Sequence, residues 1–415
     1  MGEEPRAGVP AWAPASVASA YRRGTGDAEA LLTGAAWDQL LDHLRQAATI
    51  IRSDRAPGEP VDQAAGYRHL LVLLALGIDE ALHASDPHDP HIGAGNVDNV
   101  LKWGMDCPDA AYRGASLRGD GVYRISGWRG TCRYLGLQVM GGMASAANVV
   151  VDDLDIDADG RFELLLCADR RPGNWMPLDP GAQALIVRQF FYDWETEEPS
   201  RLTIERLGEA PSEAEPVPME PAGLGRQIVA LGEFVTSSLR FWLDIEEAGR
   251  AEGINCFRQP AARTDMGGAA ENVTVWGSWD LADGEALIIE VAPPDALYWS
   301  VSIGNYWWET IDYANHQSSL NGHQATLDGD GVFRAVVSHT DPGVANWLDT
   351  AGHRRGPAIF RFVRADGEAP VPATRVVALS DLDAALPPGT ARVDAATRRQ
   401  VIARRREGVR RRFHH

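Results

Sequence analysis

Two stretches of the sequence are so alike that they limit the fold to one built on a repeated unit. Residues 165–188 read LLCADRRPGNWMPLDPGAQALIVR, and residues 336–361 read VVSHTDPGVANWLDTAGHRRGPAIFR. Both contain an apolar run, an Asp-containing turn, Pro-Gly, Asn-Trp, a Gly-containing loop and apolar residues that end in Arg. Upstream, DADGRFELLL (157–166) aligns with DGDGVFRAVV (328–337). Because the offset between matched positions drifts only from 171 to 173 residues, we predict a duplicated β module.

The two copies differ in the residues that could carry out chemistry. The second copy has His339, Asp341 and His353, where the first has Ala168 or Asp169 and a loop without histidine. A duplicated fold keeps its packing residues in both copies, whereas chemistry can settle in one. We therefore interpret the shared Asn-Trp pair and the shared arginine as structural, and the histidine-bearing copy as the better site candidate.

The composition indicates a soluble globular protein without affinity for nucleic acid. The chain has 415 residues, enough for two or three domains, with 45% hydrophobic and 23% charged residues. The net charge of −19 argues against a nucleic-acid partner, because a phosphate backbone would repel the chain. The segment from Arg392 onward is Arg-rich, so the rest of the chain is more acidic still.

Cysteine usage and hydropathy favour a cytoplasmic protein with no membrane span. The four cysteines are scattered without a CxxC pair, which favours reduced thiols over disulfides. No N-terminal stretch resembles a signal peptide. The longest apolar run, LLVLLALGI, is far shorter than the roughly 20 residues needed to cross a bilayer.

The predicted elements follow the order helices, β module, long helix, β module, helix. Short strands separated by Gly and Asp turns, without βαβ alternation, favour antiparallel sandwiches. The predicted fold class is therefore α+β, with two related antiparallel β-sandwich modules from an internal duplication and flanking helices. The predicted regions are a flexible N-terminal arm (1–25), a helical region (26–94), a first β module (95–206), an acidic Pro-rich linker (207–222), a long helix (223–252), a second β module (253–385) and a basic C-terminal helix (386–415).

One acidic stretch matches part of a calcium site. Asp155, Asp157, Asp159 and Gly160 fit the opening of an EF-hand loop, but Leu166 stands where that loop needs a bidentate Glu. Asp and Gly are also the residues favoured in tight turns. We interpret the stretch as a strand-to-strand turn.

No cofactor is predicted. A GxGxxG or GxxxxGK[ST] stretch opening a helix is absent from the sequence, so a nucleotide site has no support. His83, His88 and His91 could bind zinc or iron, since neutral imidazoles are ligands for both metals. Their spacing is not that of a helical ligand pair, and solvated loop histidines are the commoner outcome.

The aromatic stretch YWSVSIGNYWWETIDYANHQSSLN (298–321) is either core or pocket. Strand alternation places Tyr298 and Ser300 on one face, and Trp299 and Val301 on the other. Large rings could seal one end of a sandwich, or they could form an apolar pocket with a few polar groups, the usual make-up of a small-molecule site. In the pocket interpretation the substrate-binding residues are Tyr298, Tyr306, Trp307, Trp308, Tyr313, Asn321 and Trp347.

Proton-transferring residues lie close to these rings in the sequence. The candidate catalytic residues are His339, Asp341, His353, Asp312 and His316. A histidine held by a carboxylate is the commonest device for proton transfer near neutral pH. The alternative is that Asp341 belongs to a turn and His353 to an ordinary loop. A GxSxG elbow and a reactive-cysteine signature are both missing, so a covalent hydrolase has little support.

Several motifs carry a family resemblance. With NWLDTAGH, SLNGHQ, DGDGVF and DPGVANW, the second module resembles the uncharacterised bacterial family called domain of unknown function 1214, and its actinobacterial branch in particular. WGMDCPDAAYRGASLRGDGVYRISGWRG (103–130) is similar to the upstream segment of the same branch. The resemblance covers most of residues 60–380. It implies jelly-roll-like β modules with helical additions, and it supplies no reaction.

We carry three hypotheses for the function. The first is a cofactor-independent enzyme acting on a hydrophobic small molecule (a terpenoid, steroid or aromatic metabolite) by acid/base or carbocation-guiding chemistry, as an isomerase, lyase or cyclase, because aromatic faces stabilise positive charge. His339 and Asp341 should then be needed for activity. The second is a non-catalytic small-molecule-binding or assembly protein, whose basic tail helix meets an acidic partner or a second copy in a homo-oligomer. The third is a metal-dependent enzyme using histidines from 83–91 or 316–353.

Overall fold

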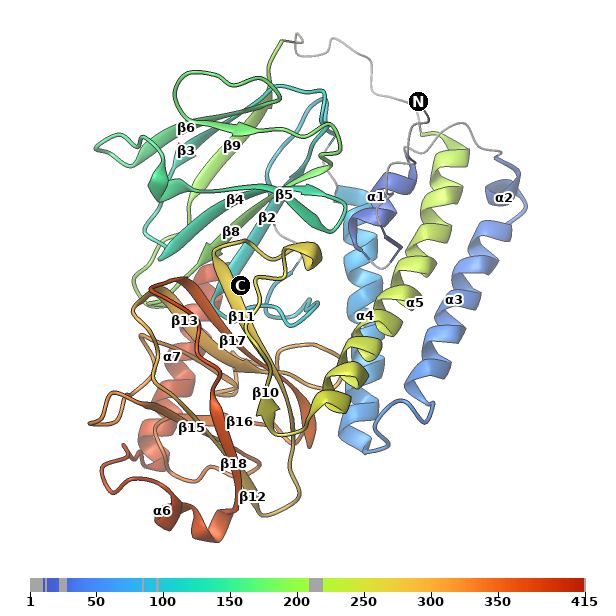
Figure 1. Cartoon of the computed structure of the whole chain (residues 1–415). Coiled ribbons are helices and arrows are strands. Elements are labelled where there is room, and N and C mark those ends of the chain that lie inside the picture. The colour runs from blue at the N-terminus through green and yellow to red at the C-terminus, as the bar shows by residue number, and fades with distance from the viewer. Residues whose placement is uncertain are drawn as a thin grey trace.

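The computed structural model describes residues 10–11, 13–21, 28–83, 86–94, 97–208 and 219–413. Two β modules lie on one side of the molecule and a group of helices on the other (Figure 1). Most of the expected N-terminal arm and of the acidic linker lies outside the described residues. Within the arm, α1 (Ala15–Tyr21) is a helix that packs on α5 (Pro221–Glu252), so this part is not a loose segment. Its composition of small residues concealed the helix, in which Val17 is fully buried.

The helical side is held together by the long helix α5. The other helices there are α2 (Glu29–Leu32), α3 (Ala35–Ile51) and α4 (Pro60–His83). The side chain of Glu220 accepts hydrogen bonds from the N–H groups of Ala222 and Gly223, which fixes the start of α5. Leu231 and Phe234 belong to the stripe of α5 that packs with buried residues of α3 and α4. Within the described part of the chain, none of the helices combines the length and apolarity that a membrane crossing requires.

The first β module consists of two sheets. Its strands are β1 (Gly93–Ala94), β2 (Ala110–Ser116), β3 (Tyr123–Trp128), β4 (Tyr134–Gly141), β5 (Ala144–Val150), β6 (Arg161–Cys167), β7 (Trp175–Pro177), β8 (Ala184–Phe190) and β9 (Arg201–Arg206). The sheets have the strand orders β1-β2-β8-β4-β5 and β7-β6-β3-β9. The pairing of β6 with β7 is parallel, and the other described pairings in the module are antiparallel.

The second β module follows α5 and repeats this arrangement. Its strands are β10 (Cys256–Phe257), β11 (Asn272–Asp280), β12 (Glu285–Val291), β13 (Ala296–Ile303), β14 (Ser319–Asn321), β15 (Phe333–Ser338), β16 (Trp347–Asp349), β17 (Arg355–Ala365) and β18 (Ala373–Ala378). The sheets have the orders β10-β11-β17-β13-β14 and β16-β15-β12-β18, so β1 to β9 correspond in sequence to β10 to β18.

The expectation of antiparallel sheets is wrong for two short pairings. β6 runs parallel to β7, and β15 runs parallel to β16. Parallel strands normally need a long crossover, but here short Asn-Trp loops connect them. The Trp175 indole N–H donates to the Cys167 carbonyl at 3.2 Å, and Trp347 donates to Ser338 at 3.1 Å. The tryptophan of each loop thus ties the returning chain to the strand it left.

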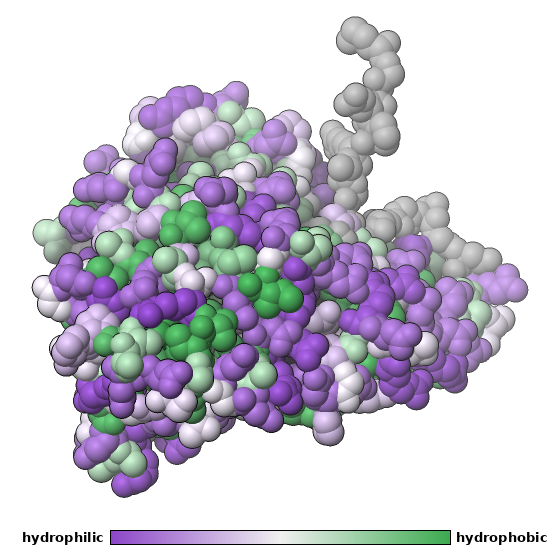
Figure 2. Space-filling model, turned by 60° about the horizontal axis from the view of Figure 1, so that its bottom comes forward, coloured by the Kyte–Doolittle hydropathy of each residue, from purple (hydrophilic) through white to green (hydrophobic). Residues whose placement is uncertain are grey.

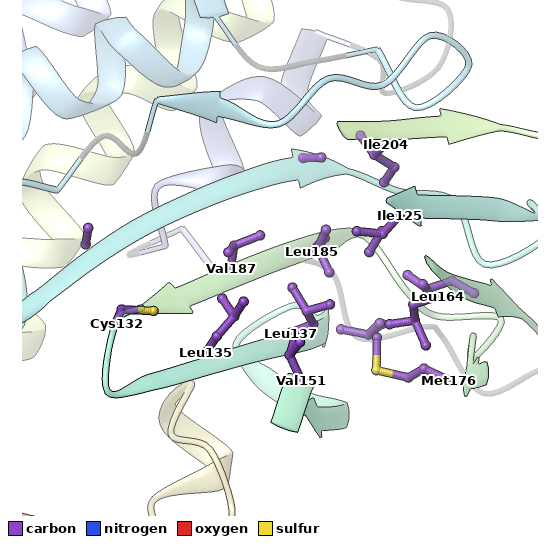
Figure 3. Packing of buried hydrophobic residues seen from close by; sticks show 14 of the residues in the cluster. Ile125, Cys132, Leu135, Leu137, Val151, Leu164, Met176, Leu185, Val187 and Ile204 are labelled. Carbon is purple, nitrogen blue, oxygen red and sulfur yellow. The ribbon is translucent and has the colours of Figure 1, made fainter. Parts of the chain in front are cut away.

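A separate hydrophobic core fills the space between the two sheets of each module. In the first module, side chains of β4 and β8 meet those of β3 and β6, and Figure 3 shows Leu137 and Leu185 directed toward Ile125 and Leu164. In the second, β13 and β17 supply one side and β12 and β15 the other. Trp299 lies in this second core, whereas Tyr298 lies outside it, as strand alternation predicts.

The basic C-terminal helix packs on its own chain through its arginines. The last helices are α6 (Leu382–Ala385) and α7 (Ala395–Phe413). Arg398, Arg405 and Arg412 recur every seven residues along one face of α7, and all three are buried. Arg398 pairs with Asp341, and Arg405 donates to the carbonyls of Tyr313 and Ser319. This arginine stripe therefore binds the body of the protein itself.

The two Asn-Trp loops make the same hydrogen bonds, which predicts how their asparagines contribute to stability. Asn346 donates to the carbonyls of Thr326 (2.7 Å) and Arg334 (2.9 Å), and its side-chain oxygen accepts from the Thr326 N–H. Asn174 makes the equivalent three bonds with Asp155 and Glu163. We predict that Asn174→Ala and Asn346→Ala each lower the free energy of unfolding by about 1–3 kcal/mol, measured by urea denaturation.

The control for this prediction is Asn315→Ala, because that amide lies in an exposed turn. Its effect should stay within about 0.5 kcal/mol of wild type. Wild-type stability of Asn346→Ala would contradict the role assigned to the loop.

Candidate functional site

Three of the predicted histidines meet around one turn at the end of the second module. His316 Nδ1 lies 2.7 Å from Asp349 Oδ2, and His339 Nδ1 lies 2.8 Å from the Thr350 hydroxyl. The backbone N–H of His353 donates to the Thr350 carbonyl at 2.9 Å. The structure therefore brings segments that lie up to 37 residues apart in sequence to one turn, which His316 and His339 contact through their side chains and His353 through its backbone.

His353 is held by an aspartate that the sequence pattern did not single out. Its Nδ1 lies 2.6 Å from Oδ1 of Asp62, which comes from the first turn of α4. Asp62 is fully buried, and its second oxygen has no hydrogen-bond partner among the described residues. In the tautomer that donates from Nδ1 to this carboxylate, Nε2 is the unprotonated nitrogen of the ring. The positive end of the helix dipole also favours a carboxylate at this position.

His339 and Asp341 make contacts of a structural kind. The second ring nitrogen of His339, Nε2, lies 3.2 Å from the Leu281 carbonyl, so both ring nitrogens have partners. Asp341 accepts a hydrogen bond from the Gly343 N–H, and its carboxylate is paired with Arg398 of α7. Both side chains thus hold loops to neighbouring elements, and their part in catalysis stays a prediction.

Asp312 and His316 form a turn on the protein surface. Burial alone would raise the pKa of Asp312, but hydrogen bonds from Asn315 and from the Ala314 N–H lower it. The hydrogen bond with Asp349 raises the pKa of His316 above its ordinary value. His316 is about one-third exposed, so its ring is accessible to solvent.

The predicted substrate-binding residues fall into two groups. Tyr298 and Asn321 both donate to Asp109, at 2.6 and 2.7 Å, and are buried where the two modules meet. Tyr313 is buried beneath Lys102, the single lysine of the chain, whose Nζ lies 4.3 Å from the ring centroid. Trp347 belongs to the Asn-Trp loop described above. These four residues have packing roles, whereas Tyr306, Trp307 and Trp308 face the helices.

Trp307 and Trp308 connect the second module to α4 and α5. The Trp307 indole N–H donates to the backbone carbonyl of Asp62 at 2.8 Å, so this ring lies beside the His353 pair. Trp308 stacks on Trp242 of α5, with ring centroids 4.9 Å apart, and meets Trp276 edge-on. Together with Met105 and Ile359 these rings form the tryptophan cluster.

The tryptophan cluster encloses an acidic residue that sequence reasoning missed. Glu246 of α5 is 1% exposed and accepts a hydrogen bond from the Trp308 indole at 3.0 Å. Burial raises the pKa of Glu246 to about 7, although Arg250 and the Trp308 N–H act to lower it. A carboxyl group with this pKa exchanges protons near neutral pH.

A chain of charged residues leads from Glu246 toward His353. Arg250 lies 4.0 Å from Glu246 and also pairs with Asp280 of β11. Arg355, two residues after His353, lies 3.7 Å from Asp280 and 2.8 Å from Glu59, the residue just before α4. The candidate site is therefore the junction of the second module with α4 and α5. The helices contribute Asp62 and Glu246 to it.

Sequence reasoning did not single out Asp62 or Glu246, and only Glu246 stands out from the pattern around it. Glu246 lies four residues after Trp242 on the apolar stripe of α5, where a carboxylate is out of place. Asp62 gives no comparable signal, because its contact with His353 spans 291 residues and depends on how the helices dock.

The described residues offer no metal centre. No group of three or more His, Cys, Asp or Glu side chains within them could hold a metal ion. The ring of His88 contacts Arg118 and Arg206, and His91 is exposed. The side chain of His83 is not among those described, so that part of the metal hypothesis stays a prediction.

One groove lies elsewhere. It measures about 790 Å³ and crosses the outer face of β3, β6 and β9, where Trp128, Arg161 and Arg201 line it. None of the predicted site residues borders it. Another face of the protein, drawn in Figure 2, is largely hydrophilic, with hydrophobic residues gathered near its middle.

The chain resembles proteins whose activity is itself unknown. Residues 286–366 match the model of a family described as protein of unknown function (DUF1214). An uncharacterised protein from Burkholderia cenocepacia, known from a crystal structure, is 34% identical, with a TM-score of 0.79 over 85% of this chain and 99% of that one. The VPA0106 protein from Vibrio parahaemolyticus is 13% identical, with a TM-score of 0.45 over 75% and 96% of the two chains. No curated protein matches the sequence.

The raised pKa of Glu246 predicts a specific pH dependence of stability. Between about pH 4.5 and 7 the folded protein holds this proton and the unfolded chain has released it, so the contribution of Glu246 to stability falls as pH rises through that window. Glu246→Gln removes the effect and keeps an acceptor for Trp308. The variant should gain up to about 3 kcal/mol over wild type at pH 8 and nothing at pH 4, measured by urea unfolding at both pH values.

The matched control is Glu247→Gln, which changes the neighbouring, partly exposed carboxylate. Its difference from wild type should not grow with pH in this way. A difference between Glu246→Gln and wild type that is the same at pH 4 and pH 8 would contradict the assigned pKa.

Proposed function

Because the chain belongs to the DUF1214 family of proteins of unknown function, which supplies no reaction, we propose its function from its own side chains. The protein is proposed to be an enzyme that transforms an apolar small molecule, of the terpenoid, steroid or aromatic kind, by acid/base chemistry without a cofactor. Isomerase, lyase and cyclase reactions all fit this class. The single observation that carries the proposal is the pair formed by His353 and the fully buried Asp62, 2.6 Å apart.

In this proposal Nε2 of His353 takes a proton from the substrate. Asp62 holds the ring in the tautomer with the proton on Nδ1 and stabilises the imidazolium that forms when Nε2 accepts a second proton. His339 acts as a positioning residue, because it binds Thr350, whose carbonyl holds the backbone of His353. The partly buried charges of Arg355, Asp280 and Arg250 would then connect the pair to Glu246 as a second proton-transferring group.

The aromatic residues at this junction support an apolar substrate. Tyr306 and Trp307 pack in the core shared by the second module and the helices, next to Asp62. Their faces carry negative electrostatic potential, which would stabilise a positive centre that develops during proton transfer or cyclisation. Tyr298, Tyr313, Asn321 and Trp347 support the site from the packed interior in this proposal.

The two modules are proposed to descend from a duplicated jelly-roll-like sandwich. Their identical strand order, including the parallel pairings, supports this origin. The equivalent bonds of Asn174 and Asn346 give independent support.

We also retain three finer proposals. Membership in the actinobacterial branch rests on the NWLDTAGH and SLNGHQ motifs. A cytoplasmic location is supported by four cysteines without disulfide bonds. A homo-oligomer is supported by α4, which exposes Tyr67, Leu71, Ile78 and Leu82 along one face, because exposed apolar stripes of this kind mark contact surfaces.

The test compares variants by untargeted metabolite profiling of a cell lysate incubated with each purified protein. His353→Asn keeps a donor where Nδ1 bonds to Asp62 and removes Nε2, so folding should be preserved while turnover is lost. Asp62→Asn should reduce turnover by roughly 10²–10⁴-fold, because the favourable tautomer is no longer fixed.

The matched control is His323→Asn, since His323 is an exposed histidine beside an aspartate, Asp193. This variant should transform the same metabolites as wild type. Thermal melting followed by circular dichroism checks that each variant is folded. Full turnover by folded His353→Asn would rule out the proposed base.

A further inference from the structure

Two arginines occupy equivalent places in the two modules. Arg188 lies in β8 and Arg361 in β17, and both side chains are less than 10% exposed. β8 and β17 correspond in the strand order of the two modules, and each is the central strand of its five-stranded sheet. The sequence pattern alone predicts a structural role for this pair.

The arginines lie on the two sheet faces that meet between the modules. The rings of Phe190 in β8 and Tyr298 in β13 lie 4.8 Å apart, in a cluster that includes Val363 of β17. Side chains two residues apart in a strand point to the same face of the sheet. Arg188 therefore shares the face of Phe190 in β8, and Arg361 shares the face of Val363 in β17, so both arginines point into this junction. The Arg188 guanidinium lies over the Tyr112 ring. Burial raises the pKa of Tyr112 to about 12, while the charges of both arginines act to lower it.

The hydrogen-bonding capacity of Arg188 is only partly used. Its Nη2 donates to the Gly267 carbonyl at 2.9 Å and its guanidinium lies 5.8 Å from the Tyr112 ring centroid, but Nη1 is buried without a partner. Arg361 donates to the Ser302 hydroxyl at 3.0 Å and to the Met105 carbonyl. Every one of these partners is uncharged.

Neither guanidinium forms an ion pair with a carboxylate in the described part of the chain. Among the residues that the structure describes, no carboxylate oxygen lies within 4.0 Å of a nitrogen of Arg188 or Arg361. Asp106, whose charge acts on Arg361, accepts from Thr310 through Oδ1, and Glu271 accepts from Tyr134 and Asn148. Buried charges in proteins are normally paired, because an isolated charge loses its hydration without compensation. The two guanidinium groups therefore carry buried positive charge that no ion pair with a described residue compensates.

Other polar atoms in the junction are also unsatisfied. The Ser300 hydroxyl, directly across the ladder from Arg361, is buried without a partner, and so is Oδ2 of Asp106. Burial raises the pKa of Asp106, although the charge of Lys102 and the hydrogen bonds from Thr310 act to lower it. Arginine and serine side chains both donate hydrogen bonds. The unsatisfied side-chain oxygen of Gln138 is an acceptor and does not take part in this donor set.

An apolar surface adjoins the donor layer. Two residues beyond Arg361 on the same face lies Ile359, which pairs across the ladder with Trp276. Both belong to the tryptophan cluster, together with Met105, whose carbonyl binds Arg361. Tyr112 and Trp276 keep part of their surface exposed, whereas the arginines are buried. The tryptophan cluster thus lies directly beside the two buried arginines.

We propose that the junction between the modules binds an amphiphilic small molecule through its oxyanion. Arg188 and Arg361 bind a carboxylate or phosphate group with help from Ser300, and the apolar body of the molecule lies against the tryptophan cluster. Arginine forks match the geometry of both oxyanions. The binding site stands apart from the acid/base proposal; only the idea that the bound molecule is also the substrate rests on that proposed function.

The test measures binding of three ten-carbon probes to the full chain by thermal melting and calorimetry at low ionic strength. Decanoate carries a carboxylate, decyl phosphate a phosphate, and decanol no charge. We expect decanoate, decyl phosphate or both to raise the Tm, decanol to leave it unchanged, and the more effective anion to identify the head group. Arg188→Met should weaken anion binding about 30-fold or more, as expected when one partner of a buried charge pair is removed.

The matched control is Arg201→Met, which removes an arginine lying over an aromatic ring, Trp128, away from the junction. It should bind the anions as wild type does. Arg188→Lys keeps the charge without the fork and should bind more weakly, which provides a test if Arg188→Met does not fold. His353→Asn should bind the probes normally, so failure of the acid/base proposal would leave this result intact. Equal responses to decanol and the anions, equal responses of wild type and Arg188→Met, or no response to either anion would overturn the proposal.

Discussion

The buried carboxylate of Asp109 is the interaction on which the relative placement of the two modules depends. It accepts hydrogen bonds from Trp194 of the first module at 2.7 Å and from Tyr298 and Asn321 of the second at 2.6 and 2.7 Å. An anion with three donors is stable in an apolar interior, whereas the same anion without them would be expelled. Loss of any one donor would therefore loosen the junction that positions Arg188 and Arg361.

The helices complete a site that the second module does not hold by itself. His353 lies in the loop before β17, but its partner Asp62 comes from α4, and Glu246 comes from α5. Trp307 bonds to the backbone of Asp62 and Trp308 to Glu246, so two adjacent rings fasten the module to both helices. The chemical difference between the modules thus arises as much from what packs against the second as from its own histidines.

Much of the fold could be predicted from the sequence, because strand alternation and repeat spacing are local patterns. The opposite faces of Tyr298 and Trp299 follow from a period of two, and the shared strand order fits the matched Gly and Asn-Trp positions. Helix α1 was missed because its small residues gave no amphipathic pattern. One hypothesis assigned the basic C-terminal helix to an acidic partner or a second copy. The spacing of seven in α7 directs Arg398 and Arg405 into the protein, where backbone carbonyls accept their hydrogen bonds.

The site was less predictable because its contacts join distant segments. Sequence reasoning named His353 without Asp62, and it placed the emphasis on His339, whose ring nitrogens are both occupied. The central claim is that Asp62 holds His353 with its proton on Nδ1 and its Nε2 free to act as a base. Long-range ¹H–¹⁵N correlation spectra of the histidine rings test this most directly, with His353 assigned by comparison with His353→Asn. The account predicts that neutral His353 is protonated on Nδ1; a spectrum showing the proton on Nε2 would contradict it.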